Sequence, residues 1–202
     1  MKKTISIIIL VGVILCSFVS CGKSNSEETK NAIDFPGKIN RERERYIAMS
    51  VQDLSKLSNE DLYEAVFART DNIVEKYTDQ IEGFKHLSGF QMVVYAASIY
   101  ELEMANGGLC QCLVNSSGEL APVFSDAFSE LGAEEHRELF ERFLTENNID
   151  VYDLTSFVCK NEKEYEAQRA RFDYDSYDAA YYKLPPLTEY IVRYAREHLE
   201  SL

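Results

Sequence analysis

Two cysteines one residue apart, Cys110 and Cys112, are the most chemically suggestive pair in this chain, because thiolates bind metals and act as nucleophiles. In a helix, residues i and i+2 point about 200° apart, so only an extended backbone could turn both thiols toward one metal. Cys159 and His136 would then have to complete a tetrahedral set. We therefore expect no metal here. The histidines are scattered singly and are expected to be exposed: His86, His136 and His198.

The glycines before this pair, Gly107 and Gly108, do not fit a phosphate-binding loop. Such a loop presents backbone amides between a strand and a helix, usually with a lysine. Here the glycines follow a long helical pattern, and Glu101 and Glu103 would repel an anion. The helical flanks also argue against a β-hairpin with an Asn-Gly turn. A catalytic thiol would need a neighbouring cation to lower its pKa. We predict two small apolar core cysteines, no catalytic residue and no cofactor.

The segment "FDYDSYD" gathers three carboxylates near the end of the chain. A helix–loop–helix calcium site counted from Asp173 needs Gly at its sixth position and Glu at its twelfth. Those positions hold Asp178 and Leu184, so the calcium motif fails. Negative charges at the start of a helix explain the cluster better. We assign these carboxylates, with two glutamates, to a candidate acidic interaction surface: Asp173, Asp175, Asp178, Glu134 and Glu135.

The elements that position these residues are predicted to be helices, because helical periodicity recurs and strand signals are scarce. The stretch from Phe90 to Met104 is apolar on nearly all sides, which predicts a buried central helix. Ser58 and Asp61 indicate the start of one helix, and Pro122 indicates the start of another. Gly132 indicates a break between two helices. The predicted fold class is all-α, a single compact multi-helix domain. Helices are expected within residues 58–77, 87–108, 120–133, 134–147, 161–176 and 185–200.

The glycine segment is then predicted to join two helices. Asparagine and glycine adopt positive φ readily, so the residues from Asn106 to Gly108 suit a helix stop. A second short helix would start at Leu109 and carry Gln111 and Asn115 on one face. We expect a structural polar set that links two loops by hydrogen bonds: Glu103, Asn106, Gly107, Gly108, Gln111 and Asn115.

The N-terminus has the pattern of an export signal. "MKK" precedes an uncharged run, "TISIIILVGVILCSFVS", and the ending "FVSC" resembles a bacterial lipobox, which implies lipidation of Cys21. We predict a lipoprotein signal peptide at residues 1–20, a lipidated N-terminus and flexible tether at 21–45, and the folded domain at 46–202. A helix near residues 41–50 would depend on tertiary contacts. The protein is expected to be exported and lipid-anchored to the bacterial cell envelope. An uncleaved anchor and an ordinary cysteine are the alternatives.

The charge balance bears on the partner. The chain has 34 acidic and 21 basic residues and a net charge of −13. Such a chain repels nucleic acid and anionic lipid, and it attracts basic protein surfaces. We expect no direct nucleic-acid binding and a basic protein as the partner. Acidity kept only for solubility is the alternative.

Residues 101–133, "ELEMANGGLCQCLVNSSGELAPVFSDAFSELGA", resemble the core motif of a bacterial domain family whose named member is an acidic DNA mimic. The matching residues are Glu103, Asn106, Gly107, Gly108, Gln111, Asn115, Gly118, Gly132 and Ala133. The resemblance extends over roughly residues 62–199, although this chain lacks the aromatic residues that the family usually places near Leu109 and Cys112. It implies an all-α, acidic, often dimeric domain, and in the named member surface carboxylates imitate DNA phosphates.

These features favour a non-enzymatic, membrane-anchored acidic interaction module that binds a basic protein. Two narrower versions are an immunity-type lipoprotein that neutralises an incoming toxin and a DNA-mimic-like inhibitor of a nucleic-acid-binding protein. Two alternatives come from other classes. One is a structural envelope component, and the other is a hydrolase with an unrecognised site that holds Glu103 or Cys110 in a deep pocket.

Overall fold

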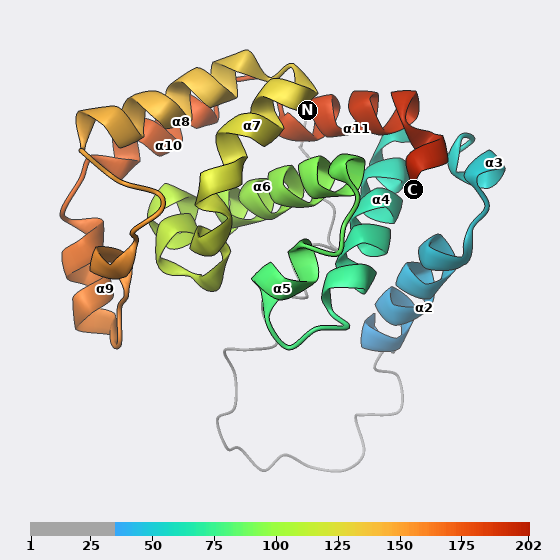
Figure 1. Ribbon diagram of the computed structural model, residues 1–202, viewed down its shortest axis with the longest axis horizontal. Coiled ribbons are helices and arrows are strands. Elements are labelled where there is room, and N and C mark those ends of the chain that lie inside the picture. The colour runs from blue at the N-terminus through green and yellow to red at the C-terminus, as the bar shows by residue number, and fades with distance from the viewer. Residues whose placement is uncertain (1–34) are drawn as a thin grey trace, which may run out of the picture.

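Helices make up all the regular structure in the part of the chain that the structure describes. The computed structural model describes the backbone of residues 35–202 and the side chains of residues 39–202 (Figure 1). No strand occurs within that range, so the predicted all-α class is confirmed there. The expected signal peptide, Cys21 and the first part of the expected tether lie outside the described residues.

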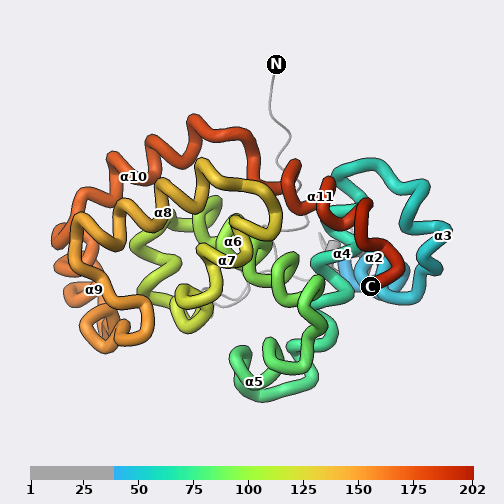
Figure 2. The backbone as a smooth tube through the Cα atoms, turned by 45° about the horizontal axis from the view of Figure 1, so that its top comes forward, coloured from blue at the N-terminus to red at the C-terminus, as the bar shows by residue number. Residues whose placement is uncertain are grey.

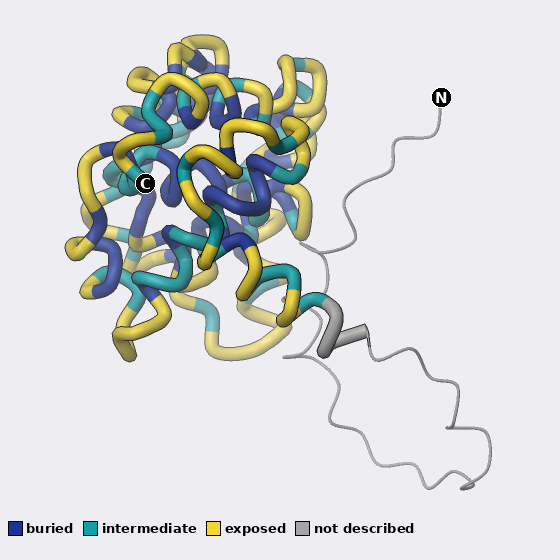
Figure 3. The backbone as a smooth tube through the Cα atoms, turned by 90° about the vertical axis from the view of Figure 1, so that its right-hand side faces the viewer, coloured by how far each residue is buried: buried dark blue, intermediate teal, exposed yellow. Residues whose placement is uncertain are grey.

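Helix α6 (Gly89–Val114) runs through the middle of the molecule, and other helices pack on several of its sides (Figure 1). It starts with a capping box, in which the Ser88 hydroxyl accepts from the backbone amide of Gln91, and the Gln91 side chain accepts from the amide of Ser88. Buried residues occur along its whole length, which confirms the predicted central helix. Figure 3 shows buried segments of the chain inside an outer layer that is largely exposed.

The N-terminal helices pack on one end of α6. Helix α4 begins after Ser58, whose hydroxyl accepts from the amide of Asp61, as the sequence predicted. Apolar residues along α4 then face α6 and the C-terminal helix. The helices of this part are α2 (Phe35–Ala48), α3 (Val51–Leu54), α4 (Asn59–Val74) and α5 (Gln80–Phe84).

Helix α2 begins at Phe35, before the boundary predicted between tether and domain at residue 46, and it packs on α4. The Arg43 guanidinium bonds the carboxylates of Asp71, at 2.9 Å, and Glu75, at 2.6 Å. Tyr46 is buried, and its hydroxyl donates to Asp61 at 2.9 Å. These partners lie 15 to 32 residues away. The local sequence of α2 has no strong apolar pattern, and tertiary contacts stabilise its helix.

The ion pair between α2 and α4 leads to a pH-dependent prediction. Asp71 is only 21% exposed, and its pKa is raised to about 6, first by burial and then by repulsion from Glu75, while Arg43 opposes the rise. The folded chain therefore holds this proton up to higher pH than the unfolded chain, whose aspartate has its ordinary pKa of 3.8. The Asp71 carboxylate thus lowers stability above pH 6, and this penalty fades as the pH falls toward about 4.

We expect Asp71→Asn to raise the free energy of unfolding at pH 7 by about 1–2 kcal/mol, and to have little effect near pH 4. Urea unfolding of both chains across this pH range measures the difference. Asp53→Asn is the control, since hydrogen bonds from Ser50 and Lys56 lower the pKa of Asp53 and the sign should reverse. A loss of stability in Asp71→Asn at pH 7 would mean that its attraction to Arg43 outweighs its burial.

The C-terminal half adds helices over the rest of α6. Gly132 has φ 67° and ψ 29°, and this left-handed residue separates α7 from α8 as predicted. The single helix predicted over 161–176 is instead two helices, because Asp173 caps a new helix after a turn. The helices are α7 (Ala121–Leu131), α8 (Glu134–Glu146), α9 (Glu162–Arg169), α10 (Tyr174–Tyr181) and α11 (Leu187–Glu197), with short 3-10 helices η2 (Ser116–Leu120), η3 (Thr155–Phe157) and η4 (Leu199–Ser201).

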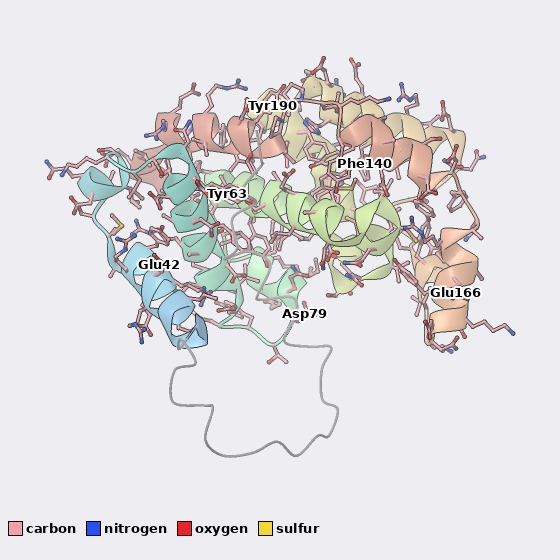
Figure 4. The ribbon with its side chains drawn as sticks, turned by 180° about the vertical axis from the view of Figure 1, so that it is seen from behind. Glu42, Tyr63, Asp79, Phe140, Glu166 and Tyr190 are labelled. Atoms are coloured by element: carbon pink, nitrogen blue, oxygen red, sulfur yellow. The ribbon has the colours of Figure 1, made fainter. Side chains whose placement is uncertain are left out.

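Aromatic rings fill the core where α6, α7, α8 and α10 meet. Tyr100 is fully buried, and its ring has edge contacts to Phe124, Phe128 and Phe140, with centroids 4.9 to 5.8 Å apart. Figure 4 places Phe140 on the inner side of α8. The Tyr100 hydroxyl forms a hydrogen bond with that of Tyr177, so the aromatic segment of α10 packs inward.

His136 is buried, with 2% of its surface exposed, which corrects the expectation that all three histidines are exposed. Its ring lies against the side chains of Tyr181 and Tyr190. His136 lies in the first turn of α8, where Tyr181 of α10 and Tyr190 of α11 cover its ring. Within residues 35–202, none of the helices has the length and apolar character needed to cross a bilayer.

Candidate functional site

The glycine segment forms a kink inside α6 and contacts α10. Gly108 has φ 75° and ψ −171°, a conformation that is essentially restricted to glycine. The next amide, of Leu109, donates to the Asp178 carboxylate at 3.0 Å. A Cβ at Gly108 would overlap that carboxylate. The positive φ expected in this segment therefore occurs at Gly108, and a short helical stretch follows it as predicted.

Asp178 is consequently a structural residue. We expected it on a free acidic surface, but it is half-buried and accepts a hydrogen bond from the backbone of α6. Burial raises the pKa of its carboxyl, and the hydrogen bond from Leu109 opposes that rise. The distance of 69 residues between the two partners explains why the sequence pattern alone did not indicate this role.

Glu103 is the acceptor that organises the expected polar set. Its carboxylate accepts from Gln111 at 3.2 Å, from Asn115 at 3.0 Å and from the Ser117 hydroxyl. The two helical parts of α6 and the start of η2 are tied together through this one side chain. Asn106 is exposed, and its side chain makes no hydrogen bond within residues 39–202. The role of this set in the structure is to fix the joint.

The cysteines are placed as small apolar core residues. Cys110 and Cys112 are buried and free, and burial raises the pKa of both thiols. Cys159 is also free and half-buried. Among the described residues, no group of three or more His, Cys, Asp or Glu side chains could hold a metal ion.

A second group of ionisable side chains lies in the interior. Tyr181 donates to Glu101, and burial raises the pKa of Glu101. His136 donates from Nε2 to the carbonyl of Pro185 at 2.9 Å, and burial lowers its pKa. A raised carboxyl pKa and a lowered imidazole pKa are properties that an acid–base catalyst could use. However, neither surface groove described below is lined by them, nor by Glu103 or Cys110.

The five carboxylates predicted as an interaction surface belong to two helices, α8 and α10, and differ in their partners. Glu134 pairs with Arg137 at 2.7 Å, and Asp175 pairs with Arg169 at 2.7 Å. Asp173 caps α10 by accepting from the amide of Ser176. Of the five, Glu135 is the exposed carboxylate that has neither an ion pair nor a capping role in the described structure.

These residues are also far apart. Helices α8 and α10 lie side by side (Figure 2). Asp173 lines a small groove between them together with Glu146 and Asn147, at the end of α8. Glu134 and Glu135 begin α8, about 18 Å away along the helix axis. Asp173 and the two glutamates therefore lie at opposite ends of α8.

A continuous acidic face lies on η2 and α7 instead. Glu119, Asp126 and Glu130 are exposed and have no ion pair in the part of the chain that the structure describes. An interval of four residues places Asp126 and Glu130 on one face of α7, and Glu119 lies in η2, directly before that helix. We call Glu119, Asp126 and Glu130 the α7 stripe.

The α7 stripe has a signal in the sequence that our pattern analysis missed. No lysine or arginine occurs between Lys85 and Arg137, so this region has no basic residue of its own to neutralise its carboxylates. One distant cation, Arg193, reaches the end of α7, but it donates to the carbonyl of Leu131 at 2.9 Å. Elsewhere, ion pairs occupy several carboxylates: Asp53, Asp71, Glu75, Glu82, Glu134, Glu141 and Asp175.

Comparison with known proteins identifies the family. No curated protein and no solved structure matches the chain. The family described as DMP19-like protein matches residues 85–198, from the last turn before α6 to the end of α11. This is a DNA-mimic-type family, so the resemblance inferred from the glycine motif is confirmed, over a shorter range than residues 62–199. Because the match covers more than half of its residues, the chain belongs to the DMP19-like protein family.

Proposed function

We propose that this protein is a lipid-anchored, non-enzymatic interaction module of the bacterial cell envelope, and that its α7 stripe binds a basic protein surface. The observation that carries the proposal is the set of three exposed carboxylates without ion pairs in the described structure, one in η2 and two on one face of α7. Membership of a DNA-mimic-type family supports it, because a mimic acts by presenting negative charge to a basic partner.

The charge density of the stripe is compatible with partial imitation of DNA. From Glu119 to Glu130 the chain rises by about 17 Å along η2 and α7. A DNA strand carries about five phosphates over that length, at one per ~3.4 Å. The three carboxylates therefore have a lower density of negative charge than one DNA strand of the same length. We expect a partner to bind the stripe with a weaker salt dependence than it shows for DNA.

The expected location narrows the partner. Residues 1–20 have the pattern of a signal peptide, and "FVSC" resembles a lipobox, so the domain would face the outside of the membrane. A partner at that location is a basic protein of the envelope or one that arrives from outside. An immunity-type role against a basic toxin fits this reading. A DNA-mimic-like inhibitor of a nucleic-acid-binding protein is the second candidate, favoured by the family.

The test uses the full chain in non-ionic detergent as bait for envelope extracts at low and high ionic strength. The variant Glu119→Gln/Asp126→Asn/Glu130→Gln removes the charge of the stripe. We expect it to weaken binding of a captured basic protein about tenfold, because three ion pairs of ~0.5 kcal/mol each are lost. The retention of the partner on the bait should also depend less steeply on salt concentration.

The matched control is Asp53→Asn/Glu82→Gln/Glu141→Gln, which removes the same charge from carboxylates that already have ion pairs. It should leave binding within about twofold. Equal losses in both variants would show that net charge, and not the stripe, attracts the partner. Displacement of the partner by duplex DNA would favour the DNA-mimic candidate over an immunity-type role.

A further inference from the structure

An apolar groove lies directly beside the first residue of the α7 stripe. It has a volume of about 470 Å³ and opens between the end of α6, η2 and the loop that precedes α9. Its wall residues are mostly apolar, and Glu119 is also part of the lining. The apolar wall residues are Leu113, Val114, Pro122, Val151, Leu154 and Phe157.

Two large hydrophobic side chains stand exposed at this groove. Tyr152 is 82% exposed and Val158 is 65% exposed, and both belong to the groove lining. Other exposed tyrosines are held in place: Tyr182 donates to the carbonyl of Met104, and Tyr77 stacks on a histidine ring. The ring and hydroxyl of Tyr152 have no such contact within the described residues. Exposed apolar groups gathered at a groove are typical of a docking surface.

The loop that carries these side chains is organised by its own carboxylates. Asp150 accepts from the amide of Tyr152 at 2.9 Å. Asp153 accepts from the amide of Thr155 at 3.2 Å and from its hydroxyl at 2.6 Å. Both aspartates are exposed, so they shape the loop and also place negative charge at the rim of the groove. The groove is therefore formed before any partner binds.

The carboxylates at the groove are Glu119 in its lining and Asp150 and Asp153 in the loop beside it. None of its lining residues is a lysine or arginine, and the chain has none between Arg142 and Lys160. One cation does reach this loop: Arg171 lies over the rings of Phe172 and of the lining residue Phe157, and its guanidinium donates to the Ser156 hydroxyl. On the other side, Pro122 lies on the same helix face as Asp126 and Glu130, so the groove runs into the α7 stripe.

We propose that this groove binds an apolar side chain of the basic partner, while lysines or arginines that flank it lie on the rim carboxylates and the α7 stripe. The occupant is thus a segment of a basic protein in which a large hydrophobic residue lies between lysines or arginines. This proposal rests on the function proposed above. A second copy of this chain would bring a further Glu119 carboxylate against the groove, whereas a basic segment would neutralise the one already there. The apolar anchor supplies selectivity that the charges alone lack.

Two synthetic peptides test the proposal: a lysine-rich peptide with one central phenylalanine, and the same peptide with serine in its place. Each is titrated by fluorescence anisotropy against the full chain in non-ionic detergent. We expect the phenylalanine peptide to bind about tenfold more tightly, and Tyr152→Ala/Val158→Ser to remove that advantage by taking away roughly 55 Å² of apolar contact. Tyr77→Ala, a change of another exposed tyrosine away from the groove, should keep it.

The outcomes separate this proposal from the function on which it rests. Equal binding of both peptides, with loss only in the variant of the α7 stripe, would overturn the groove and leave the acidic stripe intact. No binding of either peptide at low ionic strength would overturn both. Sedimentation of the detergent-solubilised chain completes the test. A dimer that Tyr152→Ala/Val158→Ser dissociates would show that a second copy occupies the groove, which also overturns the proposal.

Discussion

Gly108→Ala is expected to lower the free energy of unfolding by about 3 kcal/mol. Part of the loss is backbone strain, because alanine at φ 75° and ψ −171° costs ~1–3 kcal/mol. The rest comes from the overlap of a Cβ with the Asp178 carboxylate, which disturbs the hydrogen bond from Leu109 to that carboxylate. Urea denaturation followed by circular dichroism measures the difference.

Gly89→Ala is the matched control for this change. Gly89 lies in the first turn of the same helix, and a Cβ there would meet no atom within 4 Å. Alanine is also the better helix former by about 0.5–1 kcal/mol, so this variant should be at least as stable as the original chain. The double variant Gly108→Ala/Asp178→Ala separates the two costs, since it removes the overlap and keeps the strain. A loss below about 1 kcal/mol in Gly108→Ala would contradict the kink described for α6.

Cys21→Ser is expected to abolish lipid attachment completely, which is the largest effect that we predict. Each acyl chain buries a dozen or more methylenes at ~0.8 kcal/mol each, so two or more chains hold the protein at the membrane essentially permanently. The original chain should incorporate labelled palmitate, and its intact mass should lack residues 1–20. The variant should incorporate no label and keep those residues.

Cys16→Ser is the control, because Cys16 lies in the segment that the signal peptidase would remove. Labelling and mass should both stay as in the original chain. An original chain that keeps residues 1–20 and takes up no palmitate would contradict lipidation. In that case the apolar run would be a membrane anchor in its own right, which its length permits at the lower limit of about 17 residues.

The helices were predictable where their signals are local. Ser58 caps α4 through an amide three residues away, and Gly132 ends α7 by its own left-handed conformation. The long apolar run of α6 needs no partner to be recognised as buried. Helix α2 was not predictable in the same way, because its stabilising contacts come from Asp61, Asp71 and Glu75 on α4.

Only the negative charge of the candidate surface was predictable, and not the residues that form it. Composition establishes that the domain is acidic, but it does not say which carboxylates have a cation beside them. Arg169 neutralises Asp175, and the backbone of Leu109 occupies Asp178 from 69 residues away. A search for long intervals without lysine or arginine would have pointed to residues 86–136, and hence to the α7 stripe.

The amino-acid sequence by itself determined the helical class, the family, the acidity and the expected export signal, because each of these depends on composition or on residues a few positions apart. Only the tertiary structure decided which charges stay free and which hydrophobic residues remain uncovered. Helix packing brings Asp178 onto Gly108, buries His136, and leaves Glu119, Asp126 and Glu130 exposed beside the groove at Tyr152. Contacts between distant segments set these environments, whereas local patterns report only on neighbouring residues and on the charge of an interval.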